Sequence, residues 1–223
     1  MSKVLIIGAS GHARVCLEIL EAAGRDVLGF FDDDPNLQGV FLHGYPIFGR
    51  ISDSAPILAD KSLEYFVAIG NNHDRKKIAS MVQQHCNHGP INAIHPLTVI
   101  SPRIQMGMGN FIAPGVIINT GTLLGDYVIL NTGATIDHDN IIHSYAQISP
   151  GCNLAGHVTI EEGAFIGTGA IIIPGKTIGA YATIGAGAVV IDDIPAHCTA
   201  VGVPARIIRQ NHSSHFKVAM YAE

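Results

Sequence analysis

The sequence predicts two domains of different classes, a small α/β domain over residues 1–90 and an all-β parallel coil over 91–223. Two observations carry this prediction. Strand and helix patterns alternate before residue 90, and after it an aliphatic residue or methionine occupies every sixth position. The positions of this repeat are Ile94, Ile100, Met106, Ile112, Ile118, Leu124, Leu130, Ile136, Ile142, Ile148, Leu154, Ile160, Ile166, Ile172, Ile178, Ile184 and Val190.

The first domain reads as a βαβ unit. We expect strands at 4–7, 27–31 and 64–69 and helices over 10–23 and 74–84, with a loop-rich stretch at 32–60 around one or two short strands. Strands that alternate with helices in this order are typical of a small, Rossmann-like parallel sheet.

The second domain reads as a β-helix built of hexapeptide repeats. Each hexad forms one flat side, and eighteen residues complete a triangular turn, so the repeat from Ile94 to Val190 makes about five turns. The aliphatic residues then stack inside, turn upon turn. The segment after Val190, with Arg206, Arg209 and Lys217, is expected to cover the open end of the coil.

Composition excludes several functional classes. The formal net charge is −5, and no cluster of lysine and arginine is long enough to bind a nucleic-acid backbone. Apolar runs are too short for a membrane-spanning helix, which argues against membrane insertion. Four cysteines lie far apart and no signal peptide is evident, so we expect a cytoplasmic protein with free thiols.

Polar and glycine residues follow each expected strand of the first domain. The turn after the first strand contains Gly8, Ser10, Gly11 and His12 at a helix N-terminus, whose free N–H groups suit a phosphate. Its glycine spacing departs from the dinucleotide fingerprint GxGxxG. The second strand ends in Asp32 and Asp33, and the third is followed by Gly70, Asn71 and Asn72. Open α/β sheets bind ligands at this edge, so we expect a nucleotide here.

His138 is the candidate for proton transfer in the coil. It follows the inward Ile136 by two residues, which places it at a corner facing outward, and it lies between Asp137 and Asp139. A histidine beside a carboxylate can accept a proton while the carboxylate stabilises its charged form.

Several segments together resemble the NeuD/PglD-type sugar acetyltransferases. This family of hexapeptide-repeat acyltransferases includes N-acetyltransferases of nucleotide-linked amino sugars and O-acetyltransferases of sialic acid. The resemblance extends to about residue 209. The segments are Gly8-Ala9-Ser10-Gly11-His12, Phe31-Asp32-Asp33, Ala68-Ile69-Gly70-Asn71-Asn72 with Arg75 and Lys76, Asn131-Thr132 followed by His138-Asp139, Leu154-Ala155-Gly156, and Val201-Gly202-Val203-Pro204-Ala205.

The resemblance implies a left-handed coil, a homotrimer, acetyl-CoA as co-substrate, no metal, and an active site between neighbouring coils. It implies that His138 is the general base, that Asp139 orients it, and that the Gly156 N–H binds the thioester oxygen. The nucleotide sugar would contact Gly8, Ser10, Gly11, His12, Asp32, Asp33, Gly70, Asn71, Asn72 and Arg75. The coenzyme would contact Gly156, Thr168, Gly185, Ala186, Gly187, Pro204 and Arg206, with Arg209 also available to its phosphates.

Two positions depart from the family pattern. His143 stands where members often have glycine, and Gln147 stands where they often have histidine, which leaves the orientation of the acceptor sugar open. Trimer formation is also favoured by apolar residues on the flat outer sides of the coil. These are Ile117, Ile129, Ile141, Ile171 and Ile173.

The leading functional hypothesis is acetyl transfer from acetyl-CoA to the amine of a nucleotide-linked amino-deoxy sugar, expected to be UDP-linked. A second hypothesis keeps the fold and acetylates a sugar hydroxyl, as in sialic acid modification. A third is a metal enzyme similar to γ-type carbonic anhydrases, with His138, His143 and His157 as ligands. The fourth is a non-catalytic sensor of nucleotide sugars.

Overall fold

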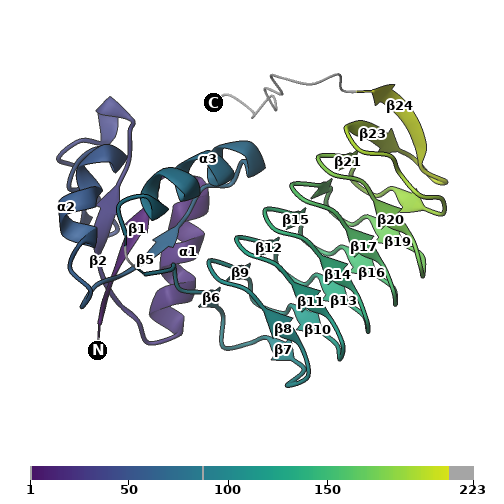
Figure 1. The fold of residues 1–223 in the computed structure, drawn as a ribbon, viewed down its shortest axis with the longest axis horizontal. Coiled ribbons are helices and arrows are strands. Elements are labelled where there is room, and N and C mark those ends of the chain that lie inside the picture. Colours follow the sequence, from purple (N-terminus) through teal and green to yellow (C-terminus); the bar gives the residue numbers. More distant parts are fainter. Residues whose placement is uncertain (1, 87, 211–223) are drawn as a thin grey trace.

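The first domain is a three-stranded parallel sheet with helices around it. The computed structural model describes residues 2–86 and 88–210. The sheet order is β2-β1-β5, from β1 (Lys3–Ile7), β2 (Asp26–Phe31) and β5 (Glu64–Val67). Helices α1 (Gly11–Ala22) and α3 (Asn72–Gln83) follow β1 and β5 and match the predicted helices, α3 beginning two residues earlier than expected. Figure 1 shows this domain beside the coil, with α3 against the coil's flank.

The stretch between β2 and β5 holds more structure than predicted. Strands β3 (Phe41–Leu42) and β4 (Tyr45–Pro46) form the short antiparallel hairpin. Two 3-10 turns (Pro35–Leu37 and Ile51–Ser54) and the one-turn helix α2 (Ala55–Leu58) were not predicted. A four-residue helix is too short to produce a hydrophobic period, so the sequence pattern cannot reveal it.

The coil is a triangular parallel β-helix with three faces. Face 1 contains β7, β10, β13, β16, β19 and β22; face 2 contains β8, β11, β14, β17 and β20; face 3 contains β6, β9, β12, β15, β18, β21, β23 and β24. The strands are β6 (Ala93–Ile94), β7 (Val99–Ile100), β8 (Gln105–Met106), β9 (Phe111–Ile112), β10 (Ile117–Ile118), β11 (Leu123–Leu124), β12 (Ile129–Leu130), β13 (Thr135–Ile136), β14 (Ile141–Ile142), β15 (Gln147–Ile148), β16 (Asn153–Leu154), β17 (Thr159–Ile160), β18 (Phe165–Ile166), β19 (Ile171–Ile172), β20 (Thr177–Ile178), β21 (Thr183–Ile184), β22 (Val189–Val190), β23 (Cys198–Val201) and β24 (Arg206–Gln210).

The predicted repeat is confirmed strand by strand. Each of its residues is the second residue of a coil strand, and from Ile112 onward all are buried, whereas Ile94, Ile100 and Met106 are only partly buried. The first turn has no coil beneath it, which explains its exposure. The coil is about six turns long rather than five because β23 pairs in parallel with β21 and completes a last turn.

At the C-terminal end of the coil, β24 pairs antiparallel with β23 and carries Arg206 and Arg209, both expected in this cap. Lys217, which we also expected in this cap, lies outside the described residues. Among the described residues, no helix is long and apolar enough to cross a bilayer. All four cysteines are free.

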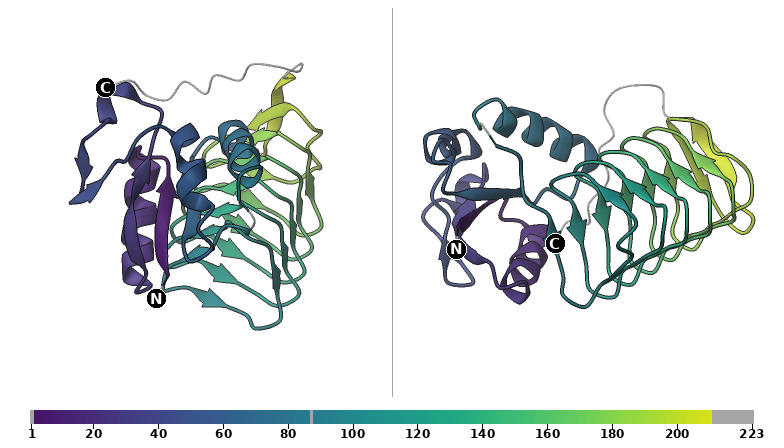
Figure 2. Two further views of the ribbon diagram at one scale, coloured as in Figure 1. Left: turned by 60° about the vertical axis from the view of Figure 1, so that its left-hand side comes forward. Right: turned by 60° about the horizontal axis from the view of Figure 1, so that its bottom comes forward.

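The first domain packs on the lower part of face 3, as the two views in Figure 2 show. The His12 ring contacts the Phe111 ring of β9, with centroids 4.7 Å apart. Ile129 on β12 is only 2% exposed and joins the core cluster that includes α1, so its prediction as a free outer residue was wrong. Ile117, Ile141 and Ile171 on faces 1 and 2 are 37 to 44% exposed, as expected of uncovered faces.

Candidate functional site

A rigid turn between β13 and β14 holds His138 at the corner between faces 1 and 2. Asn140 is fully buried beneath this turn; its side chain donates to the Asp137 carbonyl at 2.6 Å and accepts from the Val158 N–H at 2.8 Å. The Asp139 N–H donates to the Thr120 carbonyl of the turn below at 3.0 Å. Both sides of the turn are therefore fixed by hydrogen bonds to neighbouring turns of the coil.

The His138 and Asp139 side chains form a hydrogen-bonded pair. Nδ1 of His138 lies 2.8 Å from Oδ2 of Asp139, which leaves Nε2 as the ring nitrogen free to accept a proton. Asp139 takes the left-handed backbone conformation, with φ of 58°, which aspartate tolerates better than most residues. The hydrogen bond to Asp139 raises the pKa of His138 above its usual value of 6.5, and the charges of Asp137 and Asp139 add to this.

Gly156 lies one turn above His138, directly against its imidazole. A Cβ on Gly156 would lie 2.6 Å from Cε1 and 2.7 Å from Nε2 of His138, so no larger residue fits without moving the ring. Among the described residues, the Gly156 N–H has no hydrogen-bond partner. A free N–H beside the proton-accepting nitrogen can bind an oxygen that becomes negative during a reaction.

Polar and glycine residues at the strand ends of the first domain form a second cluster. Gly8 has φ of 108°, and a Cβ there would lie 2.9 Å from the Ala68 carbonyl oxygen, so the turn requires glycine. Oδ2 of Asp32 accepts from the Ala9 N–H at 2.6 Å, which ties the turn to the end of β2. Ser10 precedes α1 and its exposed side chain makes no capping hydrogen bond, so it stays available to a ligand.

Asp33 is exposed beside Asp32. One of its carboxylate oxygens accepts from the Ile51 N–H at 2.9 Å, and Asp32 also accepts from the Asp34 N–H at 2.8 Å. Both carboxylates thus retain accepting capacity while they organise the surrounding loops. The edge predicted to bind a nucleotide is assembled by Gly8, Ser10, Asp32 and Asp33.

Comparison with known proteins identifies the family. Residues 3–82 match the family model of the PglD N-terminal domain, and residues 157–192 match that of the bacterial transferase hexapeptide (six repeats). The GDP-perosamine N-acetyltransferase of Escherichia coli O157:H7 is 34% identical over 221 residues, which cover 94% of this chain and 97% of that protein. The chain belongs to the NeuD/PglD-type sugar acetyltransferases.

Solved structures of high similarity agree with this assignment. PerB from Caulobacter crescentus, in complex with CoA and GDP-perosamine, is 42% identical with a TM-score of 0.86 and covers 93% of this chain and 97% of that one. The acetyltransferase domain of PglB from Neisseria gonorrhoeae, in complex with acetyl coenzyme A, is 35% identical with a TM-score of 0.86, over 93% and 99% of the chains. This family member is therefore an acyltransferase of the sugar N-acetyltransferase class, with the Rossmann-like domain and left-handed β-helix that the resemblance implied.

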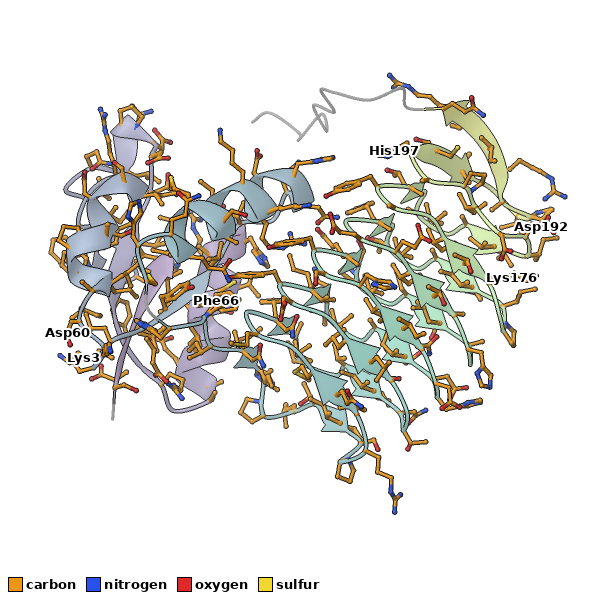
Figure 3. All side chains as sticks on the ribbon, in the orientation of Figure 1. Lys3, Asp60, Phe66, Lys176, Asp192 and His197 are labelled. Carbon is orange, nitrogen blue, oxygen red and sulfur yellow. The ribbon has the colours of Figure 1, made fainter. Side chains whose placement is uncertain are left out.

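Apart from Gly156, which lies against His138, the residues expected to border the coenzyme lie away from the His138 corner. Thr168 and Gly187 lie between faces 3 and 1, where the Gly187 N–H donates to the Thr168 carbonyl at 2.8 Å. Thr168, Ala186, Gly187, Pro204 and Arg206 are exposed, and Gly185 is half-buried. Arg206 lies 3.4 Å from Asp192, which Figure 3 places on the upper part of the coil. Within one chain, the structure does not bring these positions to the His138 corner.

Of the residues predicted to contact the nucleotide sugar, Arg75 and Asn72 serve the domain junction, and Asn71 caps a helix. Arg75 is 1% exposed, and all five of its N–H donors bond to protein oxygens, so the prediction that it binds the ligand was wrong. Asn72 is buried and donates to the Gly163 carbonyl of the coil at 3.0 Å. Asn71 caps α3 by accepting from the N–H groups of His73 and Asp74. Gly70, like Asn71, is half-exposed at the strand end.

His12 lies at the predicted edge but differs from the expected phosphate contact. Burial, together with the nearby charge of Arg75, lowers the pKa of His12 to about 4. The imidazole is therefore neutral at physiological pH and contributes no positive charge to a phosphate. Its ring packs on Phe111 of the coil, and this contact sets its orientation.

His157 was not predicted to lie beside Asp139. Its Nε2 is 3.7 Å from Oδ2 of Asp139, and its ring meets the His138 ring edge-on at 5.2 Å. One ligand atom each from His138, Asp139 and His157 lies within 4.8 Å of the others, so these three residues, rather than the set with His143, could hold a metal ion. The spacing of eighteen between 139 and 157 is the signal that could have found this neighbour.

Proposed function

We propose that this protein transfers the acetyl group of acetyl-CoA to the amine of a GDP-linked amino-deoxy sugar, with His138 as general base. The observation that carries the proposal is the pair of His138 and Asp139, whose free Nε2 lies beside the unpaired N–H of Gly156. Relatives of 34 and 42% identity are named for, or bound to, GDP-perosamine, and PerB also holds CoA. These relatives favour GDP over the UDP expected from the sequence.

In this mechanism the neutral amine attacks the thioester carbon of acetyl-CoA. Nε2 of His138 accepts the amine proton as the carbon–nitrogen bond forms, and Asp139 stabilises the resulting imidazolium. The Gly156 N–H donates to the oxygen that becomes negative in the tetrahedral intermediate. When the carbon–sulfur bond breaks, the imidazolium returns the proton to the departing thiolate of CoA, so no covalent enzyme intermediate is required.

The chemistry of the acidic pair also supports guanine as the base. Guanine presents two adjacent donors, N1–H and the exocyclic amino group, which a carboxylate accepts together. Uracil presents a single N–H between two carbonyl oxygens, and these carbonyls repel a carboxylate. Asp32 and Asp33 offer only accepting oxygens at the strand ends, a pattern that suits guanine better.

We further propose a homotrimer with the active site between chains. In one chain, the His138 corner lies between faces 1 and 2, and the first domain packs on face 3. Of the expected coenzyme positions, Thr168, Ala186 and Gly187 lie between faces 3 and 1. A shallow depression of about 340 Å³ on face 1, lined by Ile117, Asp137 and Ile171 among others, borders the His138 corner. A second coil set against such a face would bring the separated groups together and cover the exposed isoleucines.

The test uses purified protein, acetyl-CoA, and a panel of GDP-, UDP- and dTDP-linked amino sugars together with sialic acid. We expect thiol release and a product carrying one more acetyl group on nitrogen only with a GDP-linked amine. Preference for a UDP-linked amine would overturn the assigned base but keep the reaction. O-acetylated sialic acid as the sole product would overturn the reaction itself.

A further inference from the structure

Helix α3 meets the coil at a corner where the coil leaves carbonyl groups unpaired. Between faces 2 and 3, the corner positions of successive turns are Tyr127, Tyr145 and Gly163, all with positive φ. Coil N–H groups at this corner bond to the residue before each of them; the Tyr145 N–H, for example, donates to the Asp126 carbonyl at 2.9 Å. Among the described residues, no backbone N–H reaches the carbonyls of these three positions.

Two side chains of α3 satisfy these carbonyls. Arg75 donates from Nε to the Tyr127 carbonyl at 2.9 Å and from Nη2 to the Tyr145 carbonyl at 2.7 Å. Asn72 donates to the Gly163 carbonyl at 3.0 Å. One buried pair of residues therefore binds three consecutive turns of the coil, and a shift of α3 along the coil would leave buried carbonyls without donors.

The same guanidinium also holds the end of β5. Nη1 of Arg75 donates to the Gly70 carbonyl at 2.9 Å and to the Ile69 carbonyl at 3.2 Å. A Cβ on Gly70 would lie 3.7 Å from Cβ of His12, and Gly8 packs on Ala68 and Ile69. Arg75 thus connects the coil, through the end of β5, to the glycine turn at the expected nucleotide site.

An arginine at this position fixes the orientation of α3 on the coil and does more than stabilise the contact. All of its partners are carbonyl or amide oxygens, with no carboxylate among them, and burial lowers the pKa of Arg75 to about 9, which still leaves it charged at neutral pH. Burying a charge is costly, and an apolar side chain would fill the space at lower cost. An apolar contact can slide, however, whereas five hydrogen bonds in a planar fork specify one orientation.

We infer that Arg75 is a positioning residue for acetyl transfer: it fixes the nucleotide-binding edge relative to the coil and so determines where the acceptor amine arrives. The inference rests on the proposed function. Both substrates bind largely to groups other than Arg75, so its loss leaves binding nearly intact. What suffers is the alignment of the two bound substrates, to which transfer rates are sensitive at displacements of about 1 Å.

The experiment compares the variants Arg75→Ala, Arg75→Lys and Asn72→Ala with a matched control, Lys76→Met. Lys76 is the next residue on α3 and also contacts the coil, through a half-exposed ion pair with Glu162 at 2.5 Å. Dissociation constants for GDP and acetyl-CoA come from calorimetry, and kcat comes from thiol release, normalised to folded protein. N-ethylguanidinium is then added to Arg75→Ala to refill the space left by the side chain.

We expect Arg75→Ala to lower kcat by about 10- to 100-fold while both dissociation constants change less than about threefold. Arg75→Lys and Asn72→Ala should lose less, and N-ethylguanidinium should restore kcat of Arg75→Ala severalfold but leave the wild type unchanged. Lys76→Met should stay within about twofold, because exposed ion pairs contribute little.

Other outcomes would overturn the inference. Unchanged kcat of the folded Arg75 variants, with only a lower melting temperature, would show that the contact serves stability alone. If Arg75→Ala does not fold, the same criterion applies to Arg75→Lys and Asn72→Ala. Absence of transfer by the wild type to every nucleotide-linked amine would instead refute the proposed function. That result is seen in the wild type itself, so it is distinct from a loss confined to the Arg75 and Asn72 variants.

Discussion

The coil and the first domain place functional residues by different rules. In the coil, residues eighteen apart stack on one another, so Asp139 lies below His157 and Thr135 lies below Asn153, to which it hydrogen-bonds at 2.7 Å. In the first domain, side chains at equivalent strand ends face either the ligand edge or the coil, as Asp33 and Asn72 do. A repeat thus determines neighbours from spacing alone, whereas an α/β domain requires knowledge of how its helices dock.

The proposed general base, His138, lies in the coil, and its removal should have the largest effect on kcat. His138→Ala should lower kcat by about 10²- to 10⁴-fold, the range for a positioned general base, with little change in KM for acetyl-CoA. His143, an exposed histidine directly after β14, supplies the control. His143→Gln should keep kcat within about threefold. If His138→Ala retained at least half of the wild-type kcat at neutral pH, the base would have to be sought elsewhere.

The fit between two turns of the coil gives the next largest effect. Gly156→Ala places a methyl group 2.6 Å from the His138 ring, so the imidazole must turn away and kcat should fall by about 10- to 100-fold. Gly156 does not have a positive φ, so alanine imposes no backbone strain there. The melting temperature should therefore change little. A normal kcat with an unchanged melting temperature would show that the ring yields to the methyl group without losing its catalytic position.

The sequence was sufficient for the coil because its period encodes both burial and direction. The repeat placed Ile136 inside and His138 outside at a corner, and the structure agrees. The same period puts His157 above Asp139, eighteen residues earlier, whereas His157 is nineteen residues from His138 and so does not stack on it. The prediction that Ile129 is exposed was wrong, and the period could not correct it because the first domain buries this residue.

In the first domain, the sequence identified an edge but not the role of each side chain on it. Arg75 and Asn72 follow a strand end as a ligand-binding residue does, and only the docking of α3 shows that they face the coil. His12 likewise sits at a helix N-terminus, yet its partners are Phe111 and the charge of Arg75. Polar side chains near a strand end serve a ligand or a domain junction, and their spacing does not distinguish these roles.

If recognition belongs to the first domain, a change there should affect one substrate only. Asp32→Ala should weaken GDP-sugar binding by about 1 to 2 kcal/mol, because it removes accepting oxygens and releases the Ala9 N–H that Asp32 holds. Affinity for acetyl-CoA should stay the same in calorimetry. Asp60→Ala is the control, an exposed carboxylate elsewhere in the domain, and should affect neither ligand. Equal losses of affinity for both ligands would indicate a folding defect and would not support recognition of the nucleotide sugar by the first domain alone.

The smallest expected effect is a shift of a pH profile, and it sharpens the role of the coil. The hydrogen bond that His138 donates to Asp139 raises the pKa of His138 above 6.5, which means that it stabilises the protonated form. Only the neutral imidazole accepts a proton, so kcat/KM should rise with pH through this pKa. In Asp139→Asn the carboxylate is lost while the left-handed conformation stays accessible, and the midpoint of the rise should move to lower pH, toward 6.5. The plateau should fall only severalfold because the base remains.

Asp137→Asn should shift the midpoint less, since the Asp137 charge is a lesser cause of the raised pKa than the hydrogen bond to Asp139. Identical midpoints in the wild type and Asp139→Asn would mean that the observed titration belongs to a group other than His138.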